Sequence, residues 1–194
     1  FHSRMTPWHR LLGLVMIDHF SGSPFKVLVE KDLSERQKFL DILLIEGSAA
    51  NWQPTLSPDG LALSDLRPHN LISFKSFQES LTADAVEHLV SCASDYRYLV
   101  QAEKRVRQEP ALLPNHLLQT LAVTARHPQK LAKALKGNHW QKTAHQGIYQ
   151  MIWGTRPIKV VVCRQVALEP RNALWLLFSG EEKHVAFAMQ HFGL

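Results

Sequence analysis

The sequence predicts a single α/β domain built on a mixed sheet. Three observations support this fold class: an amphipathic helical pattern near the start of the chain, several strand-like apolar segments, and a second long helical pattern between two of these segments. The 194 residues are enough for one well-packed core and short for two full domains. We therefore expect one domain over residues 1–194, with a β-rich extension after its core.

The first helix is predicted over residues 6–20. Thr6 is a favourable N-cap, and Pro7 suits the first helical position. Six apolar side chains recur at helical spacing and form one stripe: Trp8, Leu11, Leu12, Val15, Met16 and Phe20. The sequence SGSP at 21–24 then breaks the helix.

Apolar segments further along the chain predict the strands of the sheet. The first two, at 25–31 and 38–46, read as a hairpin. Residues 47–68 are rich in Gly, Pro, Ser and Asp and predict a long loop, in which LSPDG at 56–60 indicates a turn and nothing more. The remaining strands are predicted at 70–75, 116–125, 147–154, 157–166 and 173–179.

Three more helices are predicted between and after these strands. Thr82 caps a long helix with one apolar face, formed by Val86, Leu89, Val90, Ala93 and Tyr96. Residues 127–136 predict a short basic helix, and residues 181–192 are weakly helical. The predicted order is therefore helix, three strands, helix and strand, followed by the β-rich extension.

Composition indicates a globular protein. Hydrophobic residues make up 45% and charged residues 20% of the chain, which are ordinary values. No apolar run approaches the ~20 residues that span a bilayer, and the first apolar segment carries His9, Arg10 and Asp18, unlike a signal peptide. Cys92 and Cys163 form neither a disulfide framework nor a zinc pattern. We expect a cytoplasmic protein without a membrane partner.

A net charge of +5, with eleven histidines counted as neutral, is compatible with a polyanionic partner such as DNA. Segment 130–142 could follow a phosphate backbone while Trp140 stacks on a base; the alternative is a solvated helix followed by a partly buried tryptophan. The histidines lack a paired i, i+4 spacing on a predicted helix, which argues against a zinc site. An exposed strand edge in the extension could support a homodimer.

Two charged residues lie within apolar strand segments: Asp41 in FLDILLI and Lys75 in ISFKS. A charged group in the middle of a strand needs a compensating partner if it is buried. Structural alternatives remain open, because Lys75 could be a solvated residue at a strand end, and Asp41 could be exposed or could pair with Lys38.

The element order and these two segments resemble the PD-(D/E)XK nuclease superfamily, and within it the recombination-promoting nuclease/transposase-like branch of uncharacterised bacterial proteins. The resemblance spans about residues 6–126 and implies a restriction-endonuclease-like αβββαβ core, with the extension over about 127–194. It implies a metal-dependent DNA endonuclease, in which Asp41 binds Mg²⁺ or Mn²⁺ and Lys75 is the catalytic cation. Such an ion would polarise the phosphoryl oxygen and activate water, while a lysine orients water or stabilises developing charge.

One position departs from the family pattern, because Ser73 stands two residues before Lys75 where an acid is expected. Some branches of the superfamily carry this acid on the following helix. Glu79 could therefore be the second metal ligand and catalytic acid, and Gln78 could orient a water; Glu30 is another possible acid. If no acid has moved, the protein is a catalytically inactive nuclease fold that acts as a binding or scaffold domain.

Overall fold

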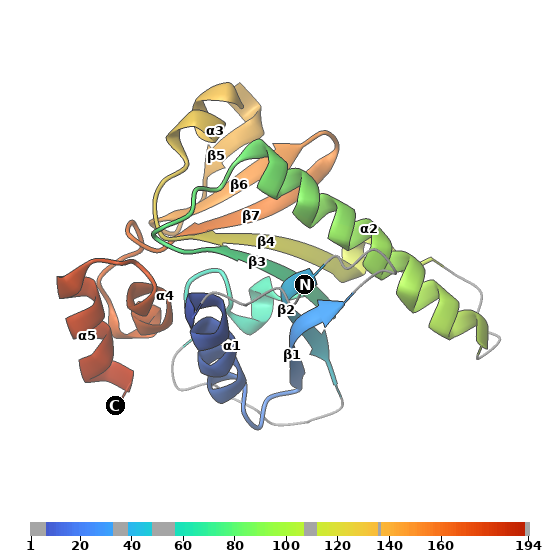
Figure 1. The fold of residues 1–194 in the computed structure, drawn as a ribbon, viewed down its shortest axis with the longest axis horizontal. Coiled ribbons are helices and arrows are strands. Elements are labelled where there is room, and N and C mark those ends of the chain that lie inside the picture. Colours follow the sequence, from blue (N-terminus) through green and yellow to red (C-terminus); the bar gives the residue numbers. More distant parts are fainter. Residues whose placement is uncertain (1–6, 33–38, 48–56, 107–111, 136, 193–194) are drawn as a thin grey trace.

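The computed structural model describes residues 7–32, 39–47, 57–106, 112–135 and 137–192. Within these ranges, seven strands form one mixed sheet in the order β1-β2-β3-β4-β7-β6-β5 (Figure 1). The strands are β1 (Phe25–Asp32), β2 (Phe39–Glu46), β3 (His69–Lys75), β4 (Leu118–Thr124), β5 (Trp140–Lys142), β6 (Ile148–Trp153) and β7 (Arg156–Val162). The helices are α1 (Pro7–His19), α2 (Ala83–Val106), α3 (Gln129–Ala134), α4 (Ala173–Leu177) and α5 (Glu182–Phe192). The predicted α/β class is confirmed.

The centre of the sheet is parallel and its two sides are antiparallel. β3 pairs with β4, and β4 with β7, in parallel, whereas β1, β2 and β3 on one side and β7, β6 and β5 on the other form antiparallel pairs. The carboxyl ends of β3, β4 and β7 therefore meet at one edge. Two backbone hydrogen bonds extend the parallel pairing beyond these strand ends. The Ala125 N–H donates to the Lys75 carbonyl and the Arg164 N–H donates to the Ala125 carbonyl, both at 3.1 Å.

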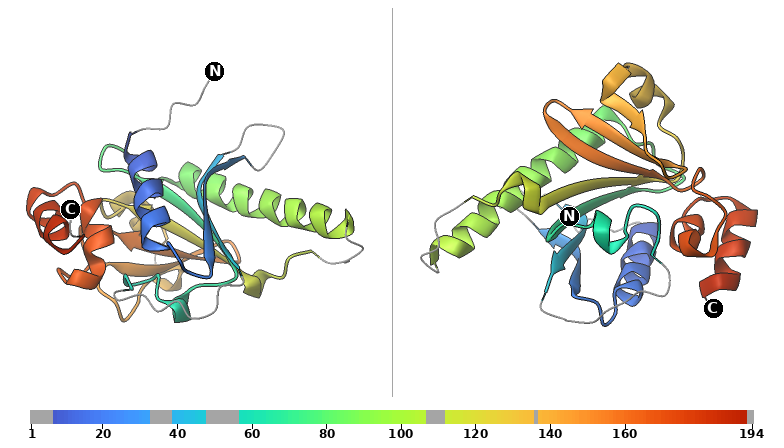
Figure 2. Two further views of the ribbon diagram at one scale, coloured as in Figure 1. Left: turned by 90° about the horizontal axis from the view of Figure 1, so that it is seen from below. Right: turned by 180° about the vertical axis from the view of Figure 1, so that it is seen from behind.

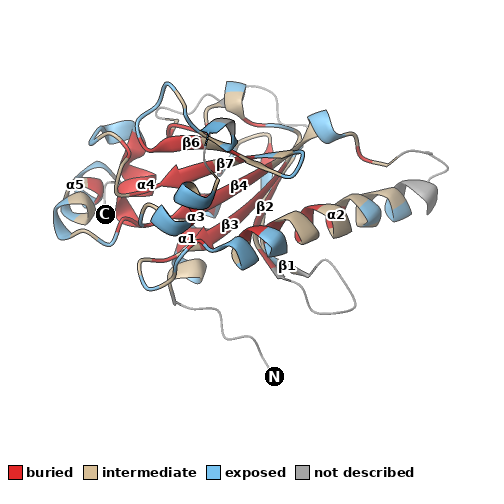
Figure 3. Ribbon diagram, turned by 90° about the horizontal axis from the view of Figure 1, so that it is seen from above, coloured by how far each residue is buried: buried red, intermediate tan, exposed pale blue. Residues whose placement is uncertain are grey.

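Helices cover both faces of the sheet and create two apolar cores. On one face α1, α4 and α5 pack against the strands, and on the other face α2 and Leu131 of α3 do so. The two views in Figure 2 agree that α2 lies across the sheet from α1 and the α4–α5 pair. Figure 3 shows buried residues along the central strands and exposed residues along the outer side of α2. None of the described helices is long and apolar enough to cross a membrane.

The C-terminal part of the chain corrects two expectations. Residues 173–179 were predicted as a strand, but Ala173–Leu177 form helix α4, whose five residues are all buried. A short, uninterrupted apolar run carries neither the period of a strand nor that of a helix, so its pattern could not separate the two. The extension is also not uniformly β-rich, because its described residues include the helices α3, α4 and α5, and its strand β7 pairs with β4 in the central sheet.

The loop before β3 is anchored in the core. The predicted turn is present, since the Leu61 N–H donates to the Pro58 carbonyl at 2.9 Å and Gly60 has φ +84°. The prediction of a turn alone was too limited, however, because Asp59 is only 5% exposed. The short 3₁₀ helix Leu63–Asp65 follows this turn, while residues 48–56 of the predicted loop lie outside the described ranges.

Asp59 forms a network with the segment that begins α4. Its N–H donates to Asn172 Oδ1 at 3.0 Å, and its Oδ2 accepts from Asn172 Nδ2 at 2.8 Å. The indole N–H of Trp175 donates to the Asp59 carbonyl at 2.9 Å. His145 Nδ1 and Arg171 Nε lie 3.1 and 3.2 Å from Asp59 Oδ1. The loop and α4 thus hold each other in place.

Candidate active site

Asp41 lies at the point where β2 and β3 cease to pair. Their antiparallel register reaches Ile42 opposite Ile72, and Asp41 is the next residue on β2. The Asp41 Oδ2 atom accepts hydrogen bonds from the Phe74 N–H at 2.8 Å and from the Ser73 hydroxyl at 3.1 Å. The carboxylate therefore accepts a backbone hydrogen bond at the point where the pairing of β2 and β3 ends. This partner explains why an acid is tolerated in this apolar strand.

His9, on α1, lies between two carboxylates. Its Nδ1 is 3.2 Å from Asp41 Oδ1, and its Nε2 is 3.2 Å from Glu79 Oε2. The ring also packs edge-on against Phe74, with 5.4 Å between ring centroids. An imidazole donates from both nitrogens only when it is protonated, so this geometry favours the imidazolium.

The charges in this cluster shift two pKa values in opposite directions from their usual values. Burial lowers the pKa of His9, but the hydrogen bond to Asp41 and the charges of Asp41 and Glu79 outweigh burial and raise it above 6.5. Burial raises the pKa of Asp41, yet His9, the Phe74 N–H and Lys75 together bring it below 3.8. Both shifts favour the ion pair of a protonated His9 with an ionised Asp41.

Glu79 reaches the same cluster from the turn that follows β3. Its Oε2 accepts hydrogen bonds from the Ser76 N–H and the Ser76 hydroxyl, both at 3.2 Å. Its Oε1 lies 3.9 Å from Lys75 Nζ. Glu79 therefore folds back over the end of β3 and, through His9, lies next to Asp41.

Other residues singled out in the sequence lie apart from this cluster. Gln78 is exposed, and its backbone N–H donates to the Ser76 hydroxyl at 3.4 Å. Glu30 is exposed and has φ +50°, a left-handed conformation that is uncommon outside glycine. Among the described residues, the hydrogen-bond, ion-pair and ring partners of His9 are Glu79, Asp41 and Phe74, and neither Gln78 nor Glu30 is one of them. Trp140 is partly buried and packs on Tyr149, with 5.1 Å between ring centroids.

The donor set fits a hard divalent cation only in part. In the part of the chain that the structure describes, no group of three or more His, Cys, Asp and Glu side chains is arranged to hold a metal ion. In the candidate site, His9 lies between the two carboxylates, with Asp41 at Nδ1 and Glu79 at Nε2. Magnesium nevertheless needs only one or two carboxylates together with waters. Asp41 and Glu79 are the two carboxylates of this cluster, and each faces a different ring nitrogen of His9.

Sequence reasoning missed His9. Seventy positions separate His9 from Glu79, and no local pattern links a polar position on the first helix to an acid on a strand or in a later turn. Comparison of the chain with protein-family models, with curated proteins and with solved structures gives no match. The case for a functional site therefore rests on the geometry of His9, Asp41, Lys75 and Glu79.

The bridging role of His9 predicts a pH-dependent loss of stability in His9→Gln. A group whose pKa is raised by folding stabilises the native state below its unfolded pKa of 6.5 and ceases to do so as pH rises through its folded pKa. In chelator, we expect His9→Gln to unfold about 1–3 kcal/mol more easily than the wild type at pH 6, with a smaller difference at pH 9. Urea unfolding at both pH values measures this difference. An equal difference at the two pH values would contradict an imidazolium bridge.

Proposed function

We propose that the protein is a metal-dependent endonuclease that hydrolyses phosphodiester bonds in DNA. The observation that carries this proposal is the convergence of Asp41, Lys75 and Glu79 at the end of β3, from positions on two strands and a turn. The order α1-β1-β2-β3-α2-β4 supports a restriction-endonuclease-like core, because it is the order that the resemblance to PD-(D/E)XK nucleases implies.

Each residue of the cluster has a distinct role in this proposal. Asp41 and Glu79 would hold Mg²⁺ or Mn²⁺, and the ion would supply Lewis-acid polarisation of a phosphoryl oxygen and a lower pKa for water. Lys75, 3.9 Å from Glu79, supplies a cation close to the charge that develops on the phosphate. His9 contacts Asp41 through Nδ1 and Glu79 through Nε2, and when protonated it offsets the mutual repulsion of the two carboxylates. Gln78, exposed in the same turn, remains a candidate for orienting water.

Cleavage of closed circular plasmid DNA tests this function. We expect nicked and linear products with Mg²⁺ or Mn²⁺ and no products with a chelator. Cleavage that persists in chelator would place the chemistry at another site. An absence of cleavage, together with an absence of Mn²⁺ binding, would contradict the nuclease proposal and favour the second candidate.

The second candidate is a catalytically inactive binding or scaffold domain. It is favoured by the ion pairs of His9 with Asp41 and Glu79, which satisfy both carboxylates without a metal. Ser73, where the family pattern has an acid, also favours it. The Ser73 hydroxyl donates to Asp41, which is a structural use of this position.

Two substitutions at the second acid separate these candidates. If Glu79 is a metal ligand, Glu79→Gln should weaken Mn²⁺ binding and lower cleavage by about 10²–10⁴-fold. Ser73→Asp should then be neutral or mildly harmful, because its carboxylate would face Asp41, to which the Ser73 hydroxyl now donates at 3.1 Å. Calorimetric titration with Mn²⁺ measures both effects. In an inactive fold the pattern is reversed: Glu79→Gln changes nothing, and Ser73→Asp creates weak binding. Glu182→Gln, at an exposed position on α5, serves as the control.

A further inference from the structure

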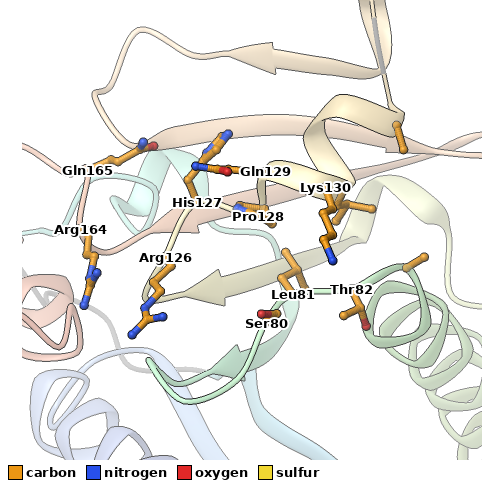
Figure 4. Close-up of a pocket in the computed structure, with 13 residues that line it drawn as sticks. Ser80, Leu81, Thr82, Arg126, His127, Pro128, Gln129, Lys130, Arg164 and Gln165 are labelled. Carbon is orange, nitrogen blue, oxygen red and sulfur yellow. The ribbon is translucent and has the colours of Figure 1, made fainter.

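A cavity of about 840 Å³ opens next to the candidate active site (Figure 4). Three segments form its walls: residues 80–83 at the start of α2, residues 126–131 and Ala134 from the end of β4 into α3, and residues 164–165 after β7. The first segment directly follows Glu79. The other two follow the ends of parallel strands, where the Ala125 N–H donates to the Lys75 carbonyl. Ligands of parallel sheets typically bind at this carboxyl edge.

The lining of this cavity carries positive charge that no acid in the lining balances. Arg126, Lys130 and Arg164 line it, and none of its lining residues is Asp or Glu. Arg126 and Lys130 are exposed, and within the described residues neither forms an ion pair. Arg164 differs from them, because its Nε donates to the Ser179 carbonyl at 2.9 Å and lies 3.5 Å from Glu181 Oε1. The exposed side chains of Arg126 and Lys130, together with the hydrogen-bonded side chain of Arg164, therefore lie around the opening of the cavity.

The directions of these side chains and the start of α2 add to the preference for an anion. Figure 4 shows Arg126 and Arg164 extending in the same direction, and Lys130 pointing toward Leu81 and Thr82. The Thr82 hydroxyl accepts the Ala85 N–H at 3.2 Å, which caps the 24-residue helix α2. The N–H groups of the first helical turn have no intrahelical acceptor and attract negative charge.

The inner part of the cavity is apolar. Leu81 and Leu131 are 4% and 5% exposed and line it together with Pro128. The His127 ring belongs to the same wall and packs against Tyr149, with 5.4 Å between ring centroids. A cationic opening over an apolar interior, with the His127 imidazole in its wall, matches a ligand with a phosphate at one end and a flat ring at the other. The volume lies within the range of about 300–1,000 Å³ that is usual for small-molecule sites.

We propose that this cavity binds one nucleoside phosphate unit, with its phosphate at Lys130 near the start of α2 and its base and sugar against Leu81 and Leu131. The unit comes either from a free nucleotide or from a nucleotide of a single strand, since both present the same groups. This binding does not depend on hydrolysis at Asp41, so it can be tested with the candidate active site free of metal.

Binding of two probes in the presence of a chelator tests the proposal. The probes are AMP, measured by calorimetry, and a fluorescent single-stranded ten-nucleotide DNA, measured by anisotropy. We expect Lys130→Ala to weaken binding of the preferred probe about tenfold, as loss of one charge-assisted phosphate contact does. Lys133→Ala is the matched control, because it removes the same charge from the same helix at an exposed position outside the cavity lining.

A further variant separates filling of the cavity from charge. Ala134→Trp places a large side chain in the lining without changing charge and should weaken binding by a similar factor. Tighter binding of the DNA identifies a strand as the source, and tighter binding of AMP identifies a free nucleotide. Equal losses in Lys130→Ala and Lys133→Ala, unchanged binding in Ala134→Trp, or no wild-type binding of either probe would each overturn the proposal. None of these results bears on plasmid cleavage, which tests the Asp41 cluster separately.

Discussion

Asp41→Asn is expected to abolish metal-dependent DNA cleavage while the protein remains folded. The substitution removes the carboxylate charge that the proposed metal requires, so activity should fall by at least about 10²-fold. The asparagine side-chain oxygen can still accept the Phe74 N–H, which Asp41 Oδ2 now accepts at 2.8 Å. The junction between β2 and β3 therefore keeps its acceptor.

Plasmid cleavage and urea unfolding should be measured on the same preparation of Asp41→Asn. A folded but inactive variant is the expected outcome, and full cleavage by the folded variant would exclude Asp41 from the chemistry. Asp18→Asn is a matched control, because it removes a carboxylate from an exposed position on α1. It should cleave DNA like the wild type.

Asp59→Ala is expected to lower the free energy of unfolding by about 3 kcal/mol, a large loss for a polar substitution. The change leaves the buried Asn172 amide without the acceptor that lies 2.8 Å away in the wild type. It also removes the charge that His145 and Arg171 face. Because these two side chains are about half exposed, water replaces most of their lost interaction, and the amide of Asn172 dominates the cost.

Asp59→Asn separates these two contributions. It keeps one acceptor oxygen for Asn172 but loses the charge, so the expected cost is about 1 kcal/mol. Urea denaturation of both variants at neutral pH gives the comparison. Equal losses in Asp59→Ala and Asp59→Asn would show that charge, rather than the buried hydrogen bond, holds the loop to α4.

The sequence predicted those parts of the fold whose pattern has a clear period. The apolar stripe located α1, and alternation with flanking turn residues located β1 and β2. α4 was missed because the apolar run at 173–179 is buried on all sides, so a helix there has no polar face to reveal its period. The burial of Asp59 was missed because a turn signal describes the backbone and says nothing about distant partners such as Asn172.

The candidate site was predictable to a similar degree. Strand adjacency and the short turn after β3 were sufficient to bring Asp41, Lys75 and Glu79 to one region, although their roles remain predictions. His9 could not be predicted, because its place depends on how α1 packs across the ends of β2 and β3. Packing of this kind is set by side-chain shape over the whole interface, which a single sequence does not display.

The hydrogen bonds between Asp59 and the segment that begins α4 also affect when the domain can fold. Asn172 and Trp175 are 113 and 116 positions from Asp59, so these contacts close a very long stretch of chain. Contacts of this length form late, since chain entropy is lost before they contribute stability. While the protein is being synthesised, the sheet face beneath α4 stays open to water until Trp175 has left the ribosome. We expect a nascent chain that stalls before this tryptophan to leave apolar strand residues uncovered, which favours chaperone binding and aggregation.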